Sequence, residues 1–159
     1  LFNNMAGVKM SHVPYKGGAP AMIDLVGGNL QLIFATMSTA LTQIKANRIR
    51  ALAVTLAQRT RLLPQTPTIA EAGVSGYESS SWYGVVAPAR TPRDIITRLN
   101  LEVSKGLLNN PAMKAKFVTS QGIQSDAPAG GTPEAFGQLI AAEQKRYQEL
   151  VKITGVKED

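Results

Sequence analysis

Cysteine is absent from this sequence of 159 residues, and histidine occurs only once, as His12. Without cysteine there is no disulfide, no thiolate metal site and no cysteine nucleophile. A single histidine excludes a histidine metal cluster, and no serine stands in a nucleophile-elbow pattern such as G-x-S-x-G. The sequence therefore predicts no catalytic residue, no metal and no cofactor. The lack of cysteine suits the cytoplasm and the periplasm equally, so it does not decide the compartment.

Long apolar runs are also missing, since none approaches the roughly 18–20 residues that a membrane-spanning helix needs. The sequence therefore predicts a chain that is not embedded in a membrane. Apolar residues make up 44% and charged residues 18%, a balance typical of globular proteins. The net charge of +6 would suit a nucleic-acid partner, but the basic residues are spread from Lys9 to Lys157. No zinc-finger spacing or RNA-recognition signature is present, so we expect no nucleic-acid partner.

Apolar segments typical of strands alternate with helical segments along the chain. The expected strands are 11–15, 30–35, 49–55, 81–88 and 122–125, and the expected helices are 20–26, 38–46, 92–108, 111–120 and 133–153. A single helical turn is expected at 69–72. This alternation predicts an α/β fold with a largely parallel sheet. Residues 1–7 are typical of the end of a helix that stops at Gly7, so we expect the chain to be a fragment of a longer protein.

The segment from Tyr15 to Pro20 joins an expected strand to an expected helix through Gly17 and Gly18. Such a turn places unpaired backbone N–H groups and the positive end of a helix at one point, which favours a carboxylate or a phosphate. It is not a P-loop, because both G-x-x-x-x-G-K-[ST] and G-x-G-x-x-G are absent. Glycine turns are common at strand ends, so a turn without any ligand remains the alternative.

Three further residues have a structural and a functional interpretation. His12, beside Val13 and Pro14, is more often a structural residue than a base. Asp24 is expected to be a solvent-facing or first-turn residue that suits the helix dipole rather than a general base. Trp82, the only tryptophan, is either a core residue or an aromatic wall of a cleft.

Several blocks in consistent order and spacing resemble the Bug family, the substrate-binding receptors of tripartite tricarboxylate transporters. The resemblance runs over the whole length, and the ordered set is highly specific, although each block alone is weak. The blocks are HVPYKGGAPA at 12–21, DLVGG at 24–28, IK at 44–45, RIRALAVT at 48–55, LPQTPTIAEAG at 63–73, GYE at 76–78, SWYG at 81–84 and APA at 87–89.

The resemblance implies an α/β, periplasmic-binding-protein-like two-lobed fold with mixed, largely parallel sheets, here incomplete because family members are about twice as long. It implies that residues 1–82 form most of ligand-binding lobe two and that 83–159 return into lobe one with the C-terminal helices. Open sheet edges in such a fragment would favour self-association.

The function implied by the resemblance is that of a periplasmic receptor, not an enzyme. It would capture a small organic acid, such as a dicarboxylate or tricarboxylate, and present it to membrane permease subunits. Two alternatives remain open at this stage. One is a solute-sensing module for a signalling partner, and the other is an α/β enzyme that acts on a carboxylate through His12, Asp24 or Glu78.

In the family, the turn that matches residues 15–19 faces the cleft and helps to hold a ligand carboxylate, partly through ordered water. We therefore expect the ligand-binding residues to be Tyr15, Lys16, Gly17, Gly18, Ala19, Thr36, Ser81 and Trp82. One departure bears on the ligand. Many members carry Asp-Asn where this chain has Ala35 and Thr36, and the missing carboxylate favours a plain organic acid over an amino acid.

Overall fold

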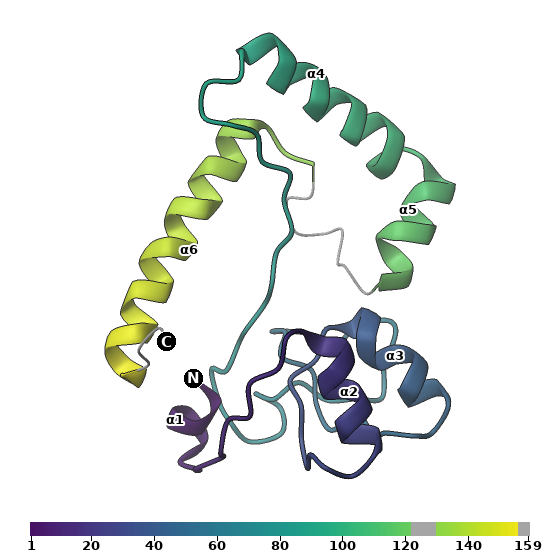
Figure 1. Cartoon of the computed structure of the whole chain (residues 1–159), viewed down its shortest axis with the longest axis vertical. Helices are drawn as coiled ribbons and strands as arrows, with labels where there is room; N and C mark the ends of the chain where they lie inside the picture. Colours follow the sequence, from purple (N-terminus) through teal and green to yellow (C-terminus); the bar gives the residue numbers. More distant parts are fainter. Residues whose placement is uncertain (122–129, 156–159) are drawn as a thin grey trace. The chain divides into compact units, whose positions relative to one another are not determined.

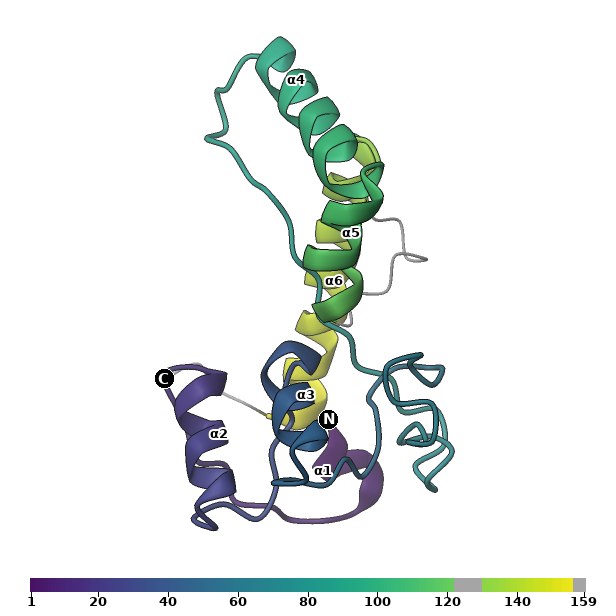
Figure 2. The ribbon, with the colours of Figure 1, turned by 90° about the vertical axis from the view of Figure 1, so that its right-hand side faces the viewer.

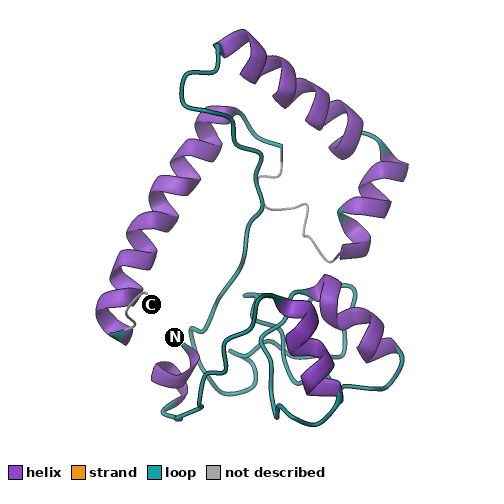
Figure 3. Cartoon of the chain, viewed as in Figure 1, coloured by secondary structure: helices purple, strands orange, loops and turns teal. Residues whose placement is uncertain are grey.

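The computed structural model describes residues 1–121 and 130–155 and divides into two compact units. The N-terminal unit comprises Phe2–Ser80, and the C-terminal unit comprises Ser81–Asp159 together with Leu1. Helices and long irregular connections make up both units (Figures 1 and 3). None of the described helices combines the length and the apolar character needed to cross a membrane.

The N-terminal unit contains three helices, α1 (Phe2–Ala6), α2 (Gly18–Val26) and α3 (Met37–Lys45). As predicted, α1 ends at Gly7, whose φ of 66° is readily available only to glycine. Helix α2 begins slightly earlier than expected and ends at Gly27, and α3 matches its predicted range within one residue.

The core of this unit is small, and most of its residues come from the irregular connections rather than from the helices. Its buried apolar residues are Ala21, Met22, Val54, Ile69 and Tyr77. The ring of Phe2 lies 5.8 Å from that of Tyr77 and 5.5 Å from that of Phe34, so α1 is anchored to the core through aromatic contacts.

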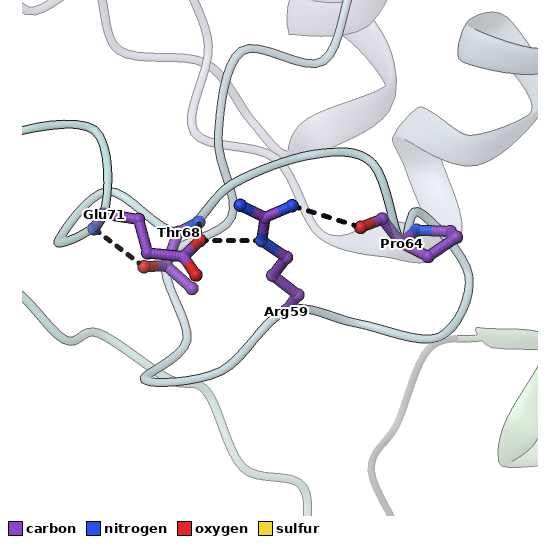
Figure 4. Close-up of polar contacts among 4 residues, drawn as sticks. All are labelled: Arg59, Pro64, Thr68 and Glu71. Carbon is purple, nitrogen blue, oxygen red and sulfur yellow. Dashed lines mark hydrogen bonds and ion pairs between the residues drawn. The ribbon is translucent and has the colours of Figure 1, made fainter.

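A single helical turn after Thr68 confirms the expectation for residues 69–72. The Ala72 N–H donates to the Thr68 carbonyl at 3.0 Å, and Gly73 ends the turn with φ 117°. Thr68 Oγ1 accepts from the Glu71 N–H at 3.0 Å, and Glu71 Oε2 accepts from the Thr68 N–H at 2.8 Å, which is a capping box (Figure 4). Arg59 Nε also donates to Glu71 Oε2 at 2.8 Å.

The C-terminal unit contains α4 (Arg93–Val103), the π-helical turn η1 (Ser104–Leu108), α5 (Pro111–Phe117), the 3₁₀ turn η2 (Thr119–Gln121) and α6 (Pro133–Thr154). The three segments α4, η1 and α5 follow one another with little interruption (Figure 2). Asn110 caps α5 by accepting from the Ala112 and Met113 N–H groups. Thr132 caps α6 by accepting from the Ala135 N–H at 3.2 Å, and Gly155, with φ 65°, is its C-cap residue.

The hydroxyl residues near two helix starts predict Thr91 as the cap of the helix at 92–108, with Pro92 as its first residue, and Ser38 or Thr39 as the cap of the helix at 38–46. Both predictions are wrong. Helix α4 begins at Arg93 with Pro92 as its N-cap, so Thr91 lies one residue outside the helix and Pro92 is not the first helical residue. Helix α3 begins after Thr36 rather than after Ser38 or Thr39. In both cases several hydroxyl residues or prolines stand close together, and their pattern alone does not select one as the cap.

The predicted strands do not form within the described residues. The only β-pairing in that part of the chain is a parallel bridge between Val54 and Thr68. It rests on bonds from the Val54 N–H to the Pro67 carbonyl at 2.8 Å and from the Ile69 N–H to the Val54 carbonyl at 2.9 Å. Segments 11–15, 30–35 and 81–88 pair with no neighbour there, because an apolar segment becomes a strand only when another segment lies beside it. The strand expected at 122–125 lies outside the described residues.

Candidate functional site

The glycine turn forms in the N-terminal unit as the sequence predicts. Gly17 is the N-cap residue of α2 and has φ 127°, a conformation that side-chain-bearing residues rarely adopt. Space does not explain this glycine, since a Cβ atom there would have nothing within 4 Å among the described residues. Gly18 and Ala19 occupy the first two helical positions, where no carbonyl lies one turn earlier in the helix to accept their N–H groups.

A second helix N-terminus lies against this turn. A Cβ atom on Gly18 would lie 3.4 Å from Thr39 Cγ2, so the first turns of α2 and α3 are in contact. Thr39 Oγ1 donates to the Thr36 carbonyl at 2.9 Å, and the Thr36 hydroxyl lies 3.1 Å from Ser38 Oγ and 3.2 Å from Thr39 Oγ1. The positive ends of two helices and three hydroxyl groups therefore gather at one point.

Neither helix end is closed by its N-cap side chain in the described structure. Gly17 has no side chain, and the Thr36 hydroxyl contacts other hydroxyls rather than a backbone N–H of α3. The turn is exposed, and Lys16 is exposed beside it. Open N–H donors at two adjacent helix ends, with a lysine next to them, suit an anionic oxygen group.

Asp24 differs from its sequence-based interpretation. It occupies the seventh of the nine positions of α2, not the first turn, and its carboxylate carries two hydrogen bonds. Tyr15 Oη donates to Asp24 Oδ2 at 2.5 Å, and Asn29 Nδ2 donates to Asp24 Oδ1 at 3.3 Å. The hydrogen bond to Asp24, more than burial, raises the pKa of Tyr15 above its ordinary value of 10.0. The spacing of nine residues between Tyr15 and Asp24 gave no signal of this contact.

Trp82 is packed against one neighbouring ring and is otherwise exposed, so it is not a buried core residue, and its place in a cleft wall stays a prediction. Its ring packs edge-on against Phe136 of α6, with centroids 5.5 Å apart, yet the residue keeps 42% of its surface exposed. Gly84 permits this packing, because a Cβ atom there would lie 2.0 Å from Phe136 Cζ. Ser81 is exposed next to Trp82. These two residues belong to the C-terminal unit and the other six predicted site residues to the N-terminal unit, so a shared cleft stays a prediction.

Other features of the described residues offer no competing centre of chemistry. An open depression of about 560 Å³ lies where α3 ends, lined by residues 47–51 with Ile44 and Thr66, and is separate from the glycine turn in sequence. Within residues 1–121 and 130–155 no group of three His, Cys, Asp or Glu side chains could hold a metal ion.

Comparison with known proteins places the chain in a family. Residues 1–156 match the family model described as Tripartite tricarboxylate transporter family receptor, TctC. A protein from Pseudomonas sp. strain P51, named for the tcbD-tcbE intergenic region, is 40% identical over 147 residues, covering 92% of this chain and 42% of that protein. Protein BugT of Bordetella pertussis is 33% identical over 157 residues, covering 99% of this chain and 47% of BugT.

Solved structures show the same similarity. R. palustris Rpa4515 with adipate superposes with a TM-score of 0.87 at 38% identity, covering 97% of this chain and 50% of that one. MatC (Rpa3494) from Rhodopseudomonas palustris with bound malate superposes with a TM-score of 0.84 at 27% identity, covering 94% of this chain and 50% of MatC. The periplasmic binding protein BugD superposes with a TM-score of 0.84 at 30% identity, covering 99% of this chain and 52% of BugD.

These superpositions confirm the predicted fold class, a periplasmic-binding-protein-like α/β fold, of which the chain matches about half. The backbone follows the path of those relatives even where the ladder hydrogen bonds of a sheet are absent from the described residues. The chain belongs to the TctC family of tripartite tricarboxylate transporter receptors, the family that includes the Bug proteins. This is a family of solute-binding receptors, which agrees with the prediction that the chain is not an enzyme. The chain spans less than half the length of the two curated relatives described above.

Proposed function

We propose that the chain contributes the carboxylate-holding turn of a receptor for a small organic acid, such as a dicarboxylate or tricarboxylate. The observation that carries the proposal is the contact between the open N-termini of α2 and α3 at Gly18 and Thr39. A helix N-terminus stabilises a nearby anion by typically about 0.3–1 kcal/mol at an exposed site. Two such ends at one point support reversible binding, which is what a transport receptor requires.

The proposed contacts follow from the geometry. The N–H groups of Gly17, Gly18 and Ala19 would donate to the carboxylate, directly or through water, and Thr36 would add a hydroxyl. Lys16 would raise the local concentration of anions. In the same proposal, Ser81 and Trp82 line the part of the cleft that comes from the C-terminal unit.

Two relatives support the ligand class. The solved structures described above hold adipate and malate, both of which are dicarboxylates. Ala35 offers no charge for an amino group, so we propose that the ligand is a plain organic acid rather than an acidic amino acid. By family membership we further propose a periplasmic location and delivery of the ligand to membrane permease subunits. Self-association of the chain through unpaired extended segments such as 81–88 is also part of the proposal.

Fluorescence titration of Trp82, the only tryptophan, tests the ligand class in the 159-residue chain. We expect a saturable change with adipate, malate or citrate, and weaker binding of glutamate than of glutarate. Calorimetry under the same conditions gives the affinity without relying on the reporter. A flat response by both methods in a folded sample would refute carboxylate capture by this chain, and tighter binding of glutamate would refute the argument from Ala35.

A matched pair of glycine variants tests the turn itself. Gly17 and Gly73 both have positive φ, 127° and 117°, and at both positions a Cβ atom would meet only open space. Alanine at either position imposes a similar backbone strain, but only Gly17 belongs to the proposed site. We expect Gly17→Ala to weaken ligand binding and Gly73→Ala to leave it unchanged. Equal loss of affinity in both variants would contradict the assignment of the turn.

A further inference from the structure

The position of Asp24 within α2 is unfavourable for the helix itself. Aspartate is a poor residue for a helix interior, and a negative charge near the C-terminal end opposes the helix dipole. Asp24 lies only three residues before Gly27, the C-cap of this nine-residue helix. Its carboxylate must therefore be stabilised by something other than the helix, and the hydrogen bonds from Tyr15 and Asn29 supply that stabilisation.

These bonds join the two ends of the segment that contains the glycine turn and α2 at one residue. Tyr15 stands immediately before the turn, and its hydroxyl reaches Asp24 two helical turns later. At the other end, the Asn29 and Leu30 N–H groups donate to the Asp24 carbonyl at 2.8 and 3.3 Å, beside the side-chain bond from Asn29. The residues between Tyr15 and Asp24 are thus closed into a loop that contains Lys16, Gly17 and Gly18.

We propose that Asp24 is a positioning residue that holds Tyr15 and thereby keeps the N–H groups of residues 17–19 ordered before a ligand arrives. The inference rests on the proposed carboxylate-binding role of this turn. Glycine has more backbone freedom than any other residue, so an unsupported turn with two consecutive glycines would have to be ordered on binding. A turn that is already ordered avoids that loss and binds more tightly.

The protonation state keeps this contact in place at neutral pH. The Tyr15 hydroxyl is the donor and the ionised Asp24 carboxylate the acceptor. An ordinary tyrosine pKa of about 10 already keeps this hydroxyl protonated at neutral pH, and the hydrogen bond to Asp24 raises the pKa of Tyr15 further. If Asp24 acted on the ligand through its charge alone, the carboxylate would repel an anion and its removal would strengthen binding. If Asp24 positions Tyr15, its removal weakens binding.

The experiment compares Tyr15→Phe, Asp24→Ala and the double variant in the 159-residue chain, with Tyr147→Phe as the matched control. Tyr147 is 52% exposed and lies in α6, outside the proposed site. We expect each single variant to weaken adipate or malate binding by about three- to tenfold, the usual effect of one hydrogen bond. The double variant should lose no more than either single variant, and Tyr147→Phe should bind as the unaltered chain does.

Nuclear relaxation of the backbone ¹⁵N nuclei in the ligand-free chain provides a second readout that does not depend on binding. We expect lower order parameters at residues 17–19 in Tyr15→Phe and Asp24→Ala, with those of Val54 and Ile69 unchanged. Asp24→Asn, which keeps an acceptor oxygen, should restore most of the order.

The outcomes separate the two proposals. If the variants loosen the turn but the unaltered chain binds no carboxylate, positioning stands and the proposed function fails. If the unaltered chain binds and the variants bind equally well with an ordered turn, positioning is overturned. Tighter binding by Asp24→Ala would also overturn it, because Asp24 would then act on the ligand mainly through charge repulsion.

Discussion

Replacement of Thr68 should destabilise the N-terminal unit through the loss of a single hydroxyl. Thr68 is 1% exposed, and its Oγ1 accepts from the Glu71 N–H at 3.0 Å (Figure 4). The Thr68 backbone also takes part in the parallel bridge with Val54. The capping box therefore holds the one turn that carries the only β-pairing of the described residues.

The magnitude follows from burial and bonding. Thr68→Val keeps the shape of the side chain but removes the acceptor, and loss of an N-cap hydroxyl typically costs about 1 kcal/mol. Water cannot easily replace the hydroxyl at a buried position, so the unpaired Glu71 N–H adds a desolvation penalty. We expect the free energy of local opening of this turn and its bridge to Val54 to fall by about 1–2 kcal/mol. This corresponds to a factor of about 5–30 in the equilibrium between the closed and open forms.

Amide hydrogen exchange is the appropriate assay, because Trp82 lies in the other unit and does not report on Thr68. The Val54 and Ile69 N–H groups are hydrogen-bonded across the bridge and should exchange about 5–30 times faster in Thr68→Val. Thr68→Ser keeps the hydroxyl and serves as the control, with a smaller effect from its lost methyl group. Equal exchange in Thr68→Val and the unaltered chain, or a larger effect from Thr68→Ser, would refute the reasoning.

Further predictions concern ionisation and close packing. Hydrogen bonds from the Thr68 backbone and from Arg59 lower the pKa of Glu71 below its ordinary 4.5. The ionised Glu71 therefore stabilises the folded chain above pH 4.5, and this contribution is lost as the pH falls through the lowered pKa. In an acid titration, Glu71→Gln should lose less stability than the unaltered chain. The pH dependence that Tyr15 contributes has the opposite sign, because its pKa is raised. The protonated Tyr15 stabilises the folded chain below pH 10, and this contribution is lost as the pH rises through the raised pKa. Tyr15→Phe should remove that loss of stability at alkaline pH. Gly84→Ala should displace the Phe136 ring and change the tryptophan emission. At Gly137, in α6, an added Cβ atom would meet only open space, so Gly137→Ala should raise the free energy of unfolding by about 1 kcal/mol. Unchanged emission in the first variant, or destabilisation in the second, would contradict the packing described.

The helices could be predicted because their signals are local. A helix forms its hydrogen bonds within four residues, so Thr132 before α6, Gly155 after it and Gly7 after α1 were readable from neighbouring residues alone. The same holds for the single turn after Thr68, where threonine and glutamate stand three residues apart. The glycine turn at Gly17 was also local, because a glycine pair shortly before a proline is typical of a turn that leads into the start of a helix.

Contacts between distant residues were decided only by the tertiary structure. Apolar patterning selected segments 30–35 and 81–88 as strands, but strand pairing depends on a neighbour that the pattern does not specify, and in the described residues only Val54 and Thr68 pair. The contact between Gly18 and Thr39 depends on how two helices pack, and the bond from Tyr15 to Asp24 depends on how the chain folds back across the turn. Sequence by itself determined where the glycine turn lies, because the signal of that turn is local. Tertiary structure decided which groups surround that turn, because side chains far apart in the sequence meet only once the backbone is folded.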